Sequence, residues 1–319
     1  MKKLFALLLA VALICVSAAA FADASTWPEK DITIICTHGA GGDTDYNARL
    51  MSRYLEKKLG VSVTVTNVTG SNGNIAMNQY KDGDNSGYTF VMTNTAALVG
   101  NEVTGVSDFS YEAFEPVAIY GRQSGENIIV MADSPYNTLQ DLIDASQAAP
   151  GTITFGISTG GGVYIAATIL NANGLEANFL DQGDANSRLV ALLGGNSEVT
   201  DAPYATVKEY IEAGQVKSLC TLLGERPTLI PDIPTASETV PDCVINTLYA
   251  CLAPKGTDPE IVEKLNAAIM DITTNDAEYG EECLGYNLQA AWSLSVEDTL
   301  TELASQRETF MKYIDLLGN

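Results

Sequence analysis

Strand-like and helix-like segments alternate along most of this 319-residue chain. Residues 31–36 are apolar and β-branched, a glycine-rich stretch follows them, and apolar residues recur at helical spacing over 46–59. The same order of strand, glycine-rich turn and helix occurs at 152–157 and 162–173. Because such alternation places helices against a sheet, the sequence predicts an α/β fold. Further strands are predicted at 61–68, 88–93, 127–132, 217–223 and 244–253. Further helices are predicted at 138–148, 186–193, 259–275 and 295–317, with a short helix after residues 70–74.

The first 22 residues have the layout of a secretory signal peptide. Lys2 and Lys3 precede an apolar run, and small residues at 20 and 22 provide a cleavage site. The apolar run is shorter than the ~20 residues that a helix needs to cross a bilayer. We therefore expect an exported, periplasmic protein, with lipidation of Cys15 and attachment to the membrane as the alternative.

The chain is strongly acidic, with a formal net charge of −23. Nucleic acids and anionic lipid surfaces are bound by clustered lysine and arginine, so the charge excludes both as expected partners. An anionic ligand would have to be held by local dipoles against the overall field of the protein.

Histidine and cysteine usage argues against a metal site. His38 is the only histidine, and the five cysteines beyond the signal peptide form no Cys-x-x-Cys pair. No metal and no cofactor are expected. Three cysteines lie in apolar, strand-like runs that are typical of buried thiols. A disulfide among Cys243, Cys251 and Cys283 is left open.

Two glycine-rich turns each join a predicted strand to a predicted helix, at residues 37–45 and 158–162. Glycine lets the backbone N–H groups turn inward, and a helix start adds unpaired donors and the positive end of a dipole. Each turn therefore predicts an anion-binding cradle made of main chain, at the sheet edge where α/β proteins bind ligands. For either turn alone, a plain tight turn with Asp45 as a helix cap is the alternative.

Common nucleotide-binding and catalytic motifs do not fit these turns. Neither turn matches a dinucleotide fingerprint or a Walker motif. Residues 156–160 match the letters G-x-S-x-G around Ser158, but His38 precedes Ser158, which is opposite to the order in α/β-hydrolases. The sequence therefore gives no catalytic residue and favours a binding protein; an exported hydrolase is the weaker alternative.

Short motifs in a fixed order run through nearly the whole chain beyond residue 26. In chain order they are Trp27-Pro28, Gly41-Gly42 with Asp45 and Ala48-Arg49, Val65-Thr66-Asn67 with Gly70-Ser71-Asn72-Gly73-Asn74-Ile75, Asp82-Gly83, Gly87-Tyr88-Thr89-Phe90, Phe114-Glu115-Pro116-Val117-Ala118, Pro150-Gly151, Leu192-Leu193-Gly194-Gly195, Arg226, Ile233-Pro234-Thr235-Ala236-Ser237-Glu238 and Ala253-Pro254-Lys255-Gly256-Thr257. Each motif is weak alone, but the ordered set resembles the substrate-binding proteins of tripartite tricarboxylate transporters, the Bug family.

The resemblance implies a type II periplasmic-binding-protein fold, with two α/β lobes, a central ligand cleft and two crossing hinge segments. The first lobe would comprise residues 23–122 and 228–319, and the second lobe residues 123–227. It also implies a monomeric, extracytoplasmic receptor that captures a small carboxylate or amino-acid-like ligand and delivers it to membrane permease subunits. A sensory subunit that presents its ligand to a membrane kinase is the alternative.

The resemblance also implies which residues bind the ligand, mainly through backbone amides and hydroxyl groups. In the first lobe they would be His38, Gly39, Ala40, Gly41, Gly42, Asp43, Thr44, Asp45, Ser71, Asn72, Thr93, Asn94 and Thr95. In the second lobe they would be Ser158, Thr159, Gly160, Gly161, Gly162, Asp181, Gln182, Gly183 and Asp201.

The chain departs from the family pattern at four places. His38 replaces an aromatic residue, Asp43 a small residue, Val163-Tyr164 a hydroxyl-rich stretch, and Asp181 a tyrosine. Two additional acids near the cleft would repel a polycarboxylate. The departures argue against citrate-like ligands and favour a zwitterion or a smaller acid.

Overall fold

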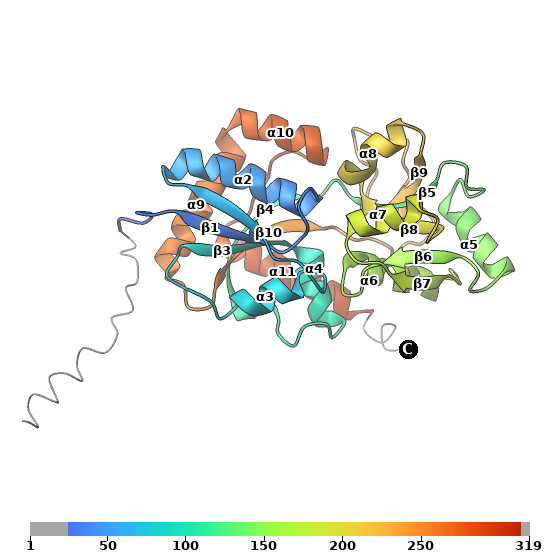
Figure 1. Cartoon of the computed structure of the whole chain (residues 1–319), viewed down its shortest axis with the longest axis horizontal. Coiled ribbons are helices and arrows are strands. Elements are labelled where there is room, and N and C mark those ends of the chain that lie inside the picture. The colour runs from blue at the N-terminus through green and yellow to red at the C-terminus, as the bar shows by residue number, and fades with distance from the viewer. Residues whose placement is uncertain (1–24, 314–319) are drawn as a thin grey trace, which may run out of the picture.

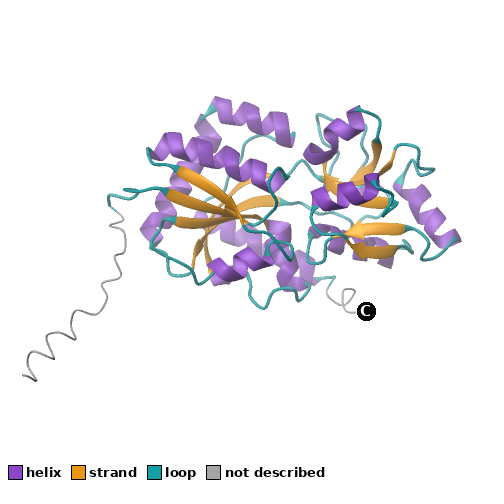
Figure 2. Cartoon of the chain, viewed as in Figure 1, coloured by secondary structure: helices purple, strands orange, loops and turns teal. Residues whose placement is uncertain are grey.

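The computed structural model describes residues 25–313. The chain forms two five-stranded sheets, each covered by helices (Figure 1). The predicted signal peptide and Cys15 lie outside these residues. The first sheet contains, in order, β2 (Val63–Asn67), β1 (Ile32–Cys36), β3 (Thr89–Asn94), β10 (Leu248–Pro254) and β4 (Phe114–Arg122). The second contains β7 (Asn178–Asp181), β6 (Thr154–Ile157), β8 (Val199–Pro203), β5 (Glu126–Met131) and β9 (Val216–Thr221). The predicted architecture of two α/β lobes is confirmed, and Figure 2 shows the sheets as two separate groups of strands.

Helices bury both faces of the first sheet. Successive side chains of a strand point to opposite faces, so Ile34 and Ile35 of β1 pack in two different clusters. The Ile34 side is covered by α2 (Asp43–Leu59), α9 (Pro259–Asn275) and α10 (Ala277–Asn287). The Ile35 side is covered by α3 (Asn74–Tyr80), α4 (Thr95–Val103) and α11 (Val296–Met311). This double burial explains why the strand is apolar almost throughout.

The second sheet is layered in the same way. Ile129 of β5 packs with Leu189 of α7 (Ala185–Leu193) and Val207 of α8 (Tyr204–Glu212). The opposite face, with Ile128, packs with α5 (Leu139–Ala148) and α6 (Gly162–Ala172).

Strand direction places the glycine-rich turns between the lobes. In each sheet four strands run in one direction. The strand that has just arrived from the other lobe, β10 in the first sheet and β5 in the second, pairs antiparallel with its two neighbours. An arriving strand starts at the edge that faces the other lobe and runs away from it. The parallel strands β1 and β6 therefore end at that edge, and the helices after them begin there.

The chain crosses between the sheets twice, between Arg122 and Glu126 and again between Thr221 and Leu248. The crossings agree with a discontinuous first lobe. The boundaries at 122/123 and 227/228 stay a prediction.

Several elements lack the sequence pattern that would have predicted them. The predicted list omits α4, β4, β7, β8, α8 and α10. The strand β8 reads Val-Thr-Asp-Ala-Pro and is entirely buried, so its polar residues are inside the protein rather than on a solvated face. Helix α10 has two glycines and weak periodicity, which lower its intrinsic helix propensity.

The five cysteines among the described residues are all free and buried. The disulfide that the sequence left open among Cys243, Cys251 and Cys283 is therefore not formed. Over residues 25–313 no helix has both the length and the hydrophobicity that crossing a bilayer requires.

Candidate functional site

A small cavity of about 60 Å³ lies between the two lobes. Both glycine-rich turns contribute to its lining, together with residues that follow β3 and begin α7. Nine of the residues predicted from the sequence line it: His38, Gly39, Gly42, Asp43, Asn72, Asn94, Ser158, Gly161 and Gly162. Segments more than a hundred residues apart in the chain thus meet at one place.

Two helices that begin at the cavity have no side-chain cap. Gly42 precedes α2 and Gly161 precedes α6, and neither can supply a side-chain acceptor to the first amides of its helix. By contrast, Asn94 caps α4 through Ala97 N, and Asp184 caps α7 through Ser187 N. The uncapped N–H groups of α2 and α6 therefore face one cavity from opposite lobes, each with the positive end of a helix dipole.

The imidazole of His38 lies at the cavity with both nitrogens close to polar partners. Nδ1 is 2.8 Å from Thr37 Oγ1, which donates in turn to Thr93 Oγ1, and Nε2 is 3.3 Å from Asn94 Nδ2. These hydrogen bonds fit a neutral imidazole ring that donates at Nδ1 and accepts at Nε2. Burial lowers the pKa of His38 despite the nearby Asp43. Protonation of His38 is therefore displaced to pH values below its ordinary range, and the ring acts as a neutral part of the wall.

Two predicted site acids hold the glycine-rich turns instead of facing the cavity. Asp45 accepts hydrogen bonds from Gly41 N at 2.9 Å and from Arg49 and Asn67. Asp181 accepts from Thr159 N at 3.1 Å and from Gly183 N at 3.0 Å. Burial alone would raise the pKa of each carboxyl group, but these bonds keep both pKa values below the ordinary range. Asp181 is in the predicted set but is not among the residues that line the cavity, because its two oxygens accept these bonds from Thr159 and Gly183.

Other predicted residues also lie behind the cavity lining. Thr44 Oγ1 accepts from Asn94, Thr95 Oγ1 accepts from Leu248 N, and the carbonyl of Gly183 accepts from Arg188. Their polar atoms are used within their own lobe, which is the physical reason that they do not line the site. The predicted residues outside the lining are Ala40, Gly41, Thr44, Asp45, Ser71, Thr93, Thr95, Thr159, Gly160, Asp181, Gln182, Gly183 and Asp201.

Sequence reasoning missed half of the lining. The missed residues are Ala96, Gln123, Glu126, Val163, Asp184, Ala185, Asn186, Arg188 and Pro203. One signal was available, since Asp184 is a good helix cap just before the predicted helix at 186–193, which indicates a third helix start. Gln123 and Glu126 lie at the first crossing between the sheets and carry no local signal.

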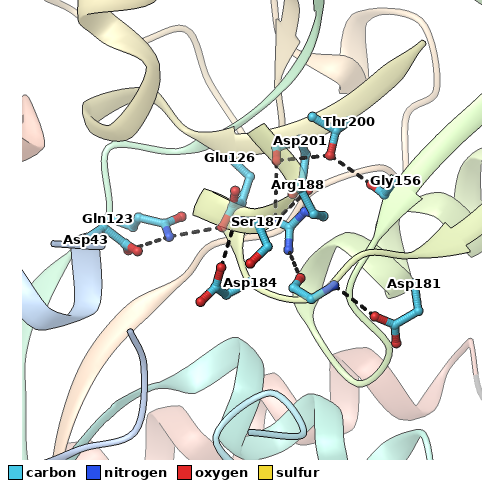
Figure 3. A network of polar contacts seen from close by, with 11 residues as sticks. Asp43, Gln123, Glu126, Gly156, Asp181, Asp184, Ser187, Arg188, Thr200 and Asp201 are labelled. Atoms are coloured by element: carbon cyan, nitrogen blue, oxygen red, sulfur yellow. Dashed lines mark hydrogen bonds and ion pairs between the residues drawn. The ribbon is translucent and has the colours of Figure 1, made fainter. Parts of the chain in front are cut away.

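A buried polar network extends from the cavity into the second lobe (Figure 3). Arg188 and Asp201 form an ion pair at 2.8 Å, with 4 % and 0 % of each residue exposed. Gln123 Nε2 donates to Asp43 Oδ2 at 2.8 Å and to Glu126 Oε1 at 3.0 Å. Gln123 thus links Asp43, the first residue of α2, to the first crossing segment. Arg188 is a cation in the cavity lining.

Burial raises the pKa of Glu126 well above its ordinary value, and the nearby Asp201 adds to this shift. The folded protein therefore keeps a proton that the unfolded chain releases above about pH 4.3. The resulting stabilisation is complete below that pH and is lost as the pH rises through the folded-state pKa.

We expect the Glu126→Gln variant to unfold at nearly the same temperature as the unchanged protein near pH 4, and at a higher temperature at pH 8. Glutamine keeps the shape but cannot ionise, so it removes the cost of a buried charge at high pH. Melting curves across this pH range measure the effect. A difference in melting temperature that is the same at every pH would contradict it.

The family comparison agrees with this architecture. Residues 47–306 match the family model described as tripartite tricarboxylate transporter family receptor. Among individual proteins, BugT of Bordetella pertussis is 29% identical over 268 residues, which are 81% of this chain and 81% of BugT.

Solved structures show the same fold. An R. palustris protein solved with adipate has a TM-score of 0.83 at 23% identity, covering 92% of this chain and 98% of that protein. The periplasmic binding protein BugD has a TM-score of 0.82 at 21% identity, covering 92% of this chain and 99% of BugD. The expected type II periplasmic-binding-protein fold is confirmed. With its fold and most of its length matched, the chain belongs to the receptor family of tripartite tricarboxylate transporters.

Proposed function

We propose that this protein captures a small carboxylate-bearing solute between its lobes, outside the cytoplasmic membrane, and delivers it to permease subunits of a tripartite tricarboxylate-type transporter. The observation that carries the proposal is the pair of uncapped helix starts, at α2 and α6, that face one cavity from opposite lobes. Such helix starts bind carboxylates through unpaired N–H groups. Arg188 in the lining adds a positive charge.

The structural relatives support the same ligand class. One R. palustris protein was solved with adipate, and MatC of Rhodopseudomonas palustris with bound malate. A receptor needs no catalytic group, and the ring nitrogens of His38 are already engaged with Thr37 and Asn94. The proposed location rests on the signal-like residues 1–22 together with the family, and a monomer suffices because one chain supplies both walls of the cavity.

A thermal-shift screen against mono-, di- and tricarboxylates and amino acids tests the proposal. A solute that binds only the folded protein stabilises it by about 2.7 kcal/mol at 100 times its Kd. At least one carboxylate should therefore raise the melting temperature. Stabilisation by uncharged sugars or simple amines, with none by any carboxylate, would contradict the proposal.

The lobes touch closely where α4 of the first lobe meets the second glycine-rich turn. A Cβ atom at Gly100 would lie only 2.3 Å from the carbonyl oxygen of Gly160. We expect Gly100→Ala to weaken solute binding by roughly tenfold or more, because the lobes could not approach as closely. The helix itself should be stabilised by about 1 kcal/mol, since alanine favours helix over glycine.

The matched control for this variant is Gly280→Ala. Gly280 lies in α10, where an added Cβ meets nothing within 4 Å. It should give the same gain in helix propensity without loss of affinity, as measured by calorimetry. Unchanged affinity in Gly100→Ala would show that closure at this contact is not needed for binding.

A further inference from the structure

The charges at the cavity are not those expected for a site that holds only an anion. Its lining includes three acids, Asp43, Glu126 and Asp184, but a single arginine, Arg188. The arginine is already paired with the buried carboxylate of Asp201. Burial raises the pKa of Glu126, which favours its neutral form. Within residues 25–313, Asp43 and Asp184 thus remain as formal negative charges that form no ion pair.

Each of these two acids directs an oxygen away from its structural partners. Asp184 uses Oδ1 to cap α7, whereas its Oδ2 faces the other lobe, 3.0 Å from the position of a Cβ at Gly39. Asp43 accepts hydrogen bonds from the Tyr249 hydroxyl and the Gln123 amide, and both bonds go to Oδ2. The two carboxylates therefore approach the cavity from opposite lobes with acceptor capacity to spare.

Gln123 provides an independent observation at the same place. Its side chain lines the cavity and only 3 % of the residue is exposed. Both hydrogen bonds of its Nε2 go to Asp43 and Glu126, which fixes the direction of the amide. Its Oε1 is buried and has no hydrogen-bond partner among residues 25–313. A buried acceptor without a donor indicates a group that the protein itself does not supply.

We propose that the solute carries an amine as well as a carboxylate, and that Asp43 and Asp184 bind its ammonium group from opposite lobes. This inference rests on the proposed function, because the uncapped starts of α2 and α6 are needed for the carboxylate. An ammonium group has three N–H donors and a positive charge, which match the acceptors left by Asp43, Asp184 and Gln123. A plain dicarboxylate would offer these oxygens no donor and would add charge repulsion.

The test measures affinities for pairs of acids that differ only by an amine. The probes are alanine and propionate, aspartate and succinate, glutamate and glutarate, and γ-aminobutyrate and butyrate, each titrated into the mature chain by calorimetry. We expect at least one amine-bearing member to bind tenfold or more tightly than its partner acid.

Two variants assign that preference to the acids. Asp184→Asn keeps a side chain that can cap α7, and we expect it to weaken the amine-bearing ligand by about 10- to 100-fold, as for loss of a charged hydrogen bond. Asp43→Asn should do the same. The control Asp144→Asn removes an equal charge from the exposed side of α5 and should change no affinity.

The outcomes separate this inference from the proposed function. Equal or tighter binding of the acids without an amine would overturn the inference and leave the carboxylate receptor intact. Binding of none of the eight probes, with no carboxylate active in the thermal screen, would contradict the proposed function itself. An amine preference that survives in both Asp43→Asn and Asp184→Asn would overturn the assignment to these residues.

Discussion

Replacing Arg188 with methionine is expected to destabilise the protein strongly and to abolish solute binding. The guanidinium group pairs with Asp201 at 2.8 Å in a site where neither residue is more than 4 % exposed. Removing one partner of a buried ion pair leaves the other charge without compensation and costs about 3–5 kcal/mol. Arg188 also lines the cavity, so the variant loses the one arginine that the lining contains among residues 25–313.

The double variant Arg188→Met/Asp201→Asn separates these two effects. With no buried charge left alone, it should recover part of the stability measured by chemical denaturation. It should still fail to bind, because the cation of the lining is missing. If the double variant bound solute as tightly as the unchanged protein, the role of Arg188 would be confined to the fold of the second lobe.

A valine in place of Gly42 is expected to abolish binding while the protein remains folded. The backbone at Gly42 has φ −79° and ψ 170°, which any residue can adopt, so the variant should not strain the chain. A Cβ there would lie 3.3 Å from the carbonyl oxygen of Gly39 and 3.7 Å from Asn186 Nδ2 across the cavity. The branched side chain would therefore occupy the space in front of the first amides of α2.

Calorimetry with the solute found in the thermal screen measures the loss, and circular dichroism confirms the fold. Gly285→Val in α10 is the matched control, because an added Cβ at that position meets nothing within 4 Å. Retained affinity in Gly42→Val would mean that the start of α2 does not contact the solute. The backbone angle at Gly42 gives no reason for glycine, so only the space around this position favours it.

The glycine-rich turns could be predicted because their requirements are local. A strand, a turn and a helix are specified by neighbouring residues, and Gly41 and Gly160 have φ values of +81° and +84° that favour glycine. The same local logic failed for β8, because its buried Thr200 and Asp201 interrupt the apolar pattern that is typical of a buried strand. Its partner Arg188 lies thirteen positions earlier in a helix, so no short pattern reveals that the pair is buried together.

Local sequence also could not decide which acids line the cavity. Asp181 ends β7 and Asp184 lies three residues later, yet the first accepts hydrogen bonds from Thr159 and Gly183 while the second faces Gly39. The difference arises because Asp184 caps α7, which orients its second oxygen toward the other lobe.

The sequence by itself determined the α/β class, the two cradles of main chain and the strong acidity, since periodicity, glycine placement and composition are properties of short segments or of the whole chain. Only the tertiary structure decided the chemistry of the cleft. Asp43 accepts hydrogen bonds from Gln123, which lies 80 positions later in the sequence, and from Tyr249, which lies 206 positions later. The chain crosses twice between the lobes before it reaches Tyr249. Such contacts depend on how two separately formed sheets are docked, and no local pattern of residues records that arrangement.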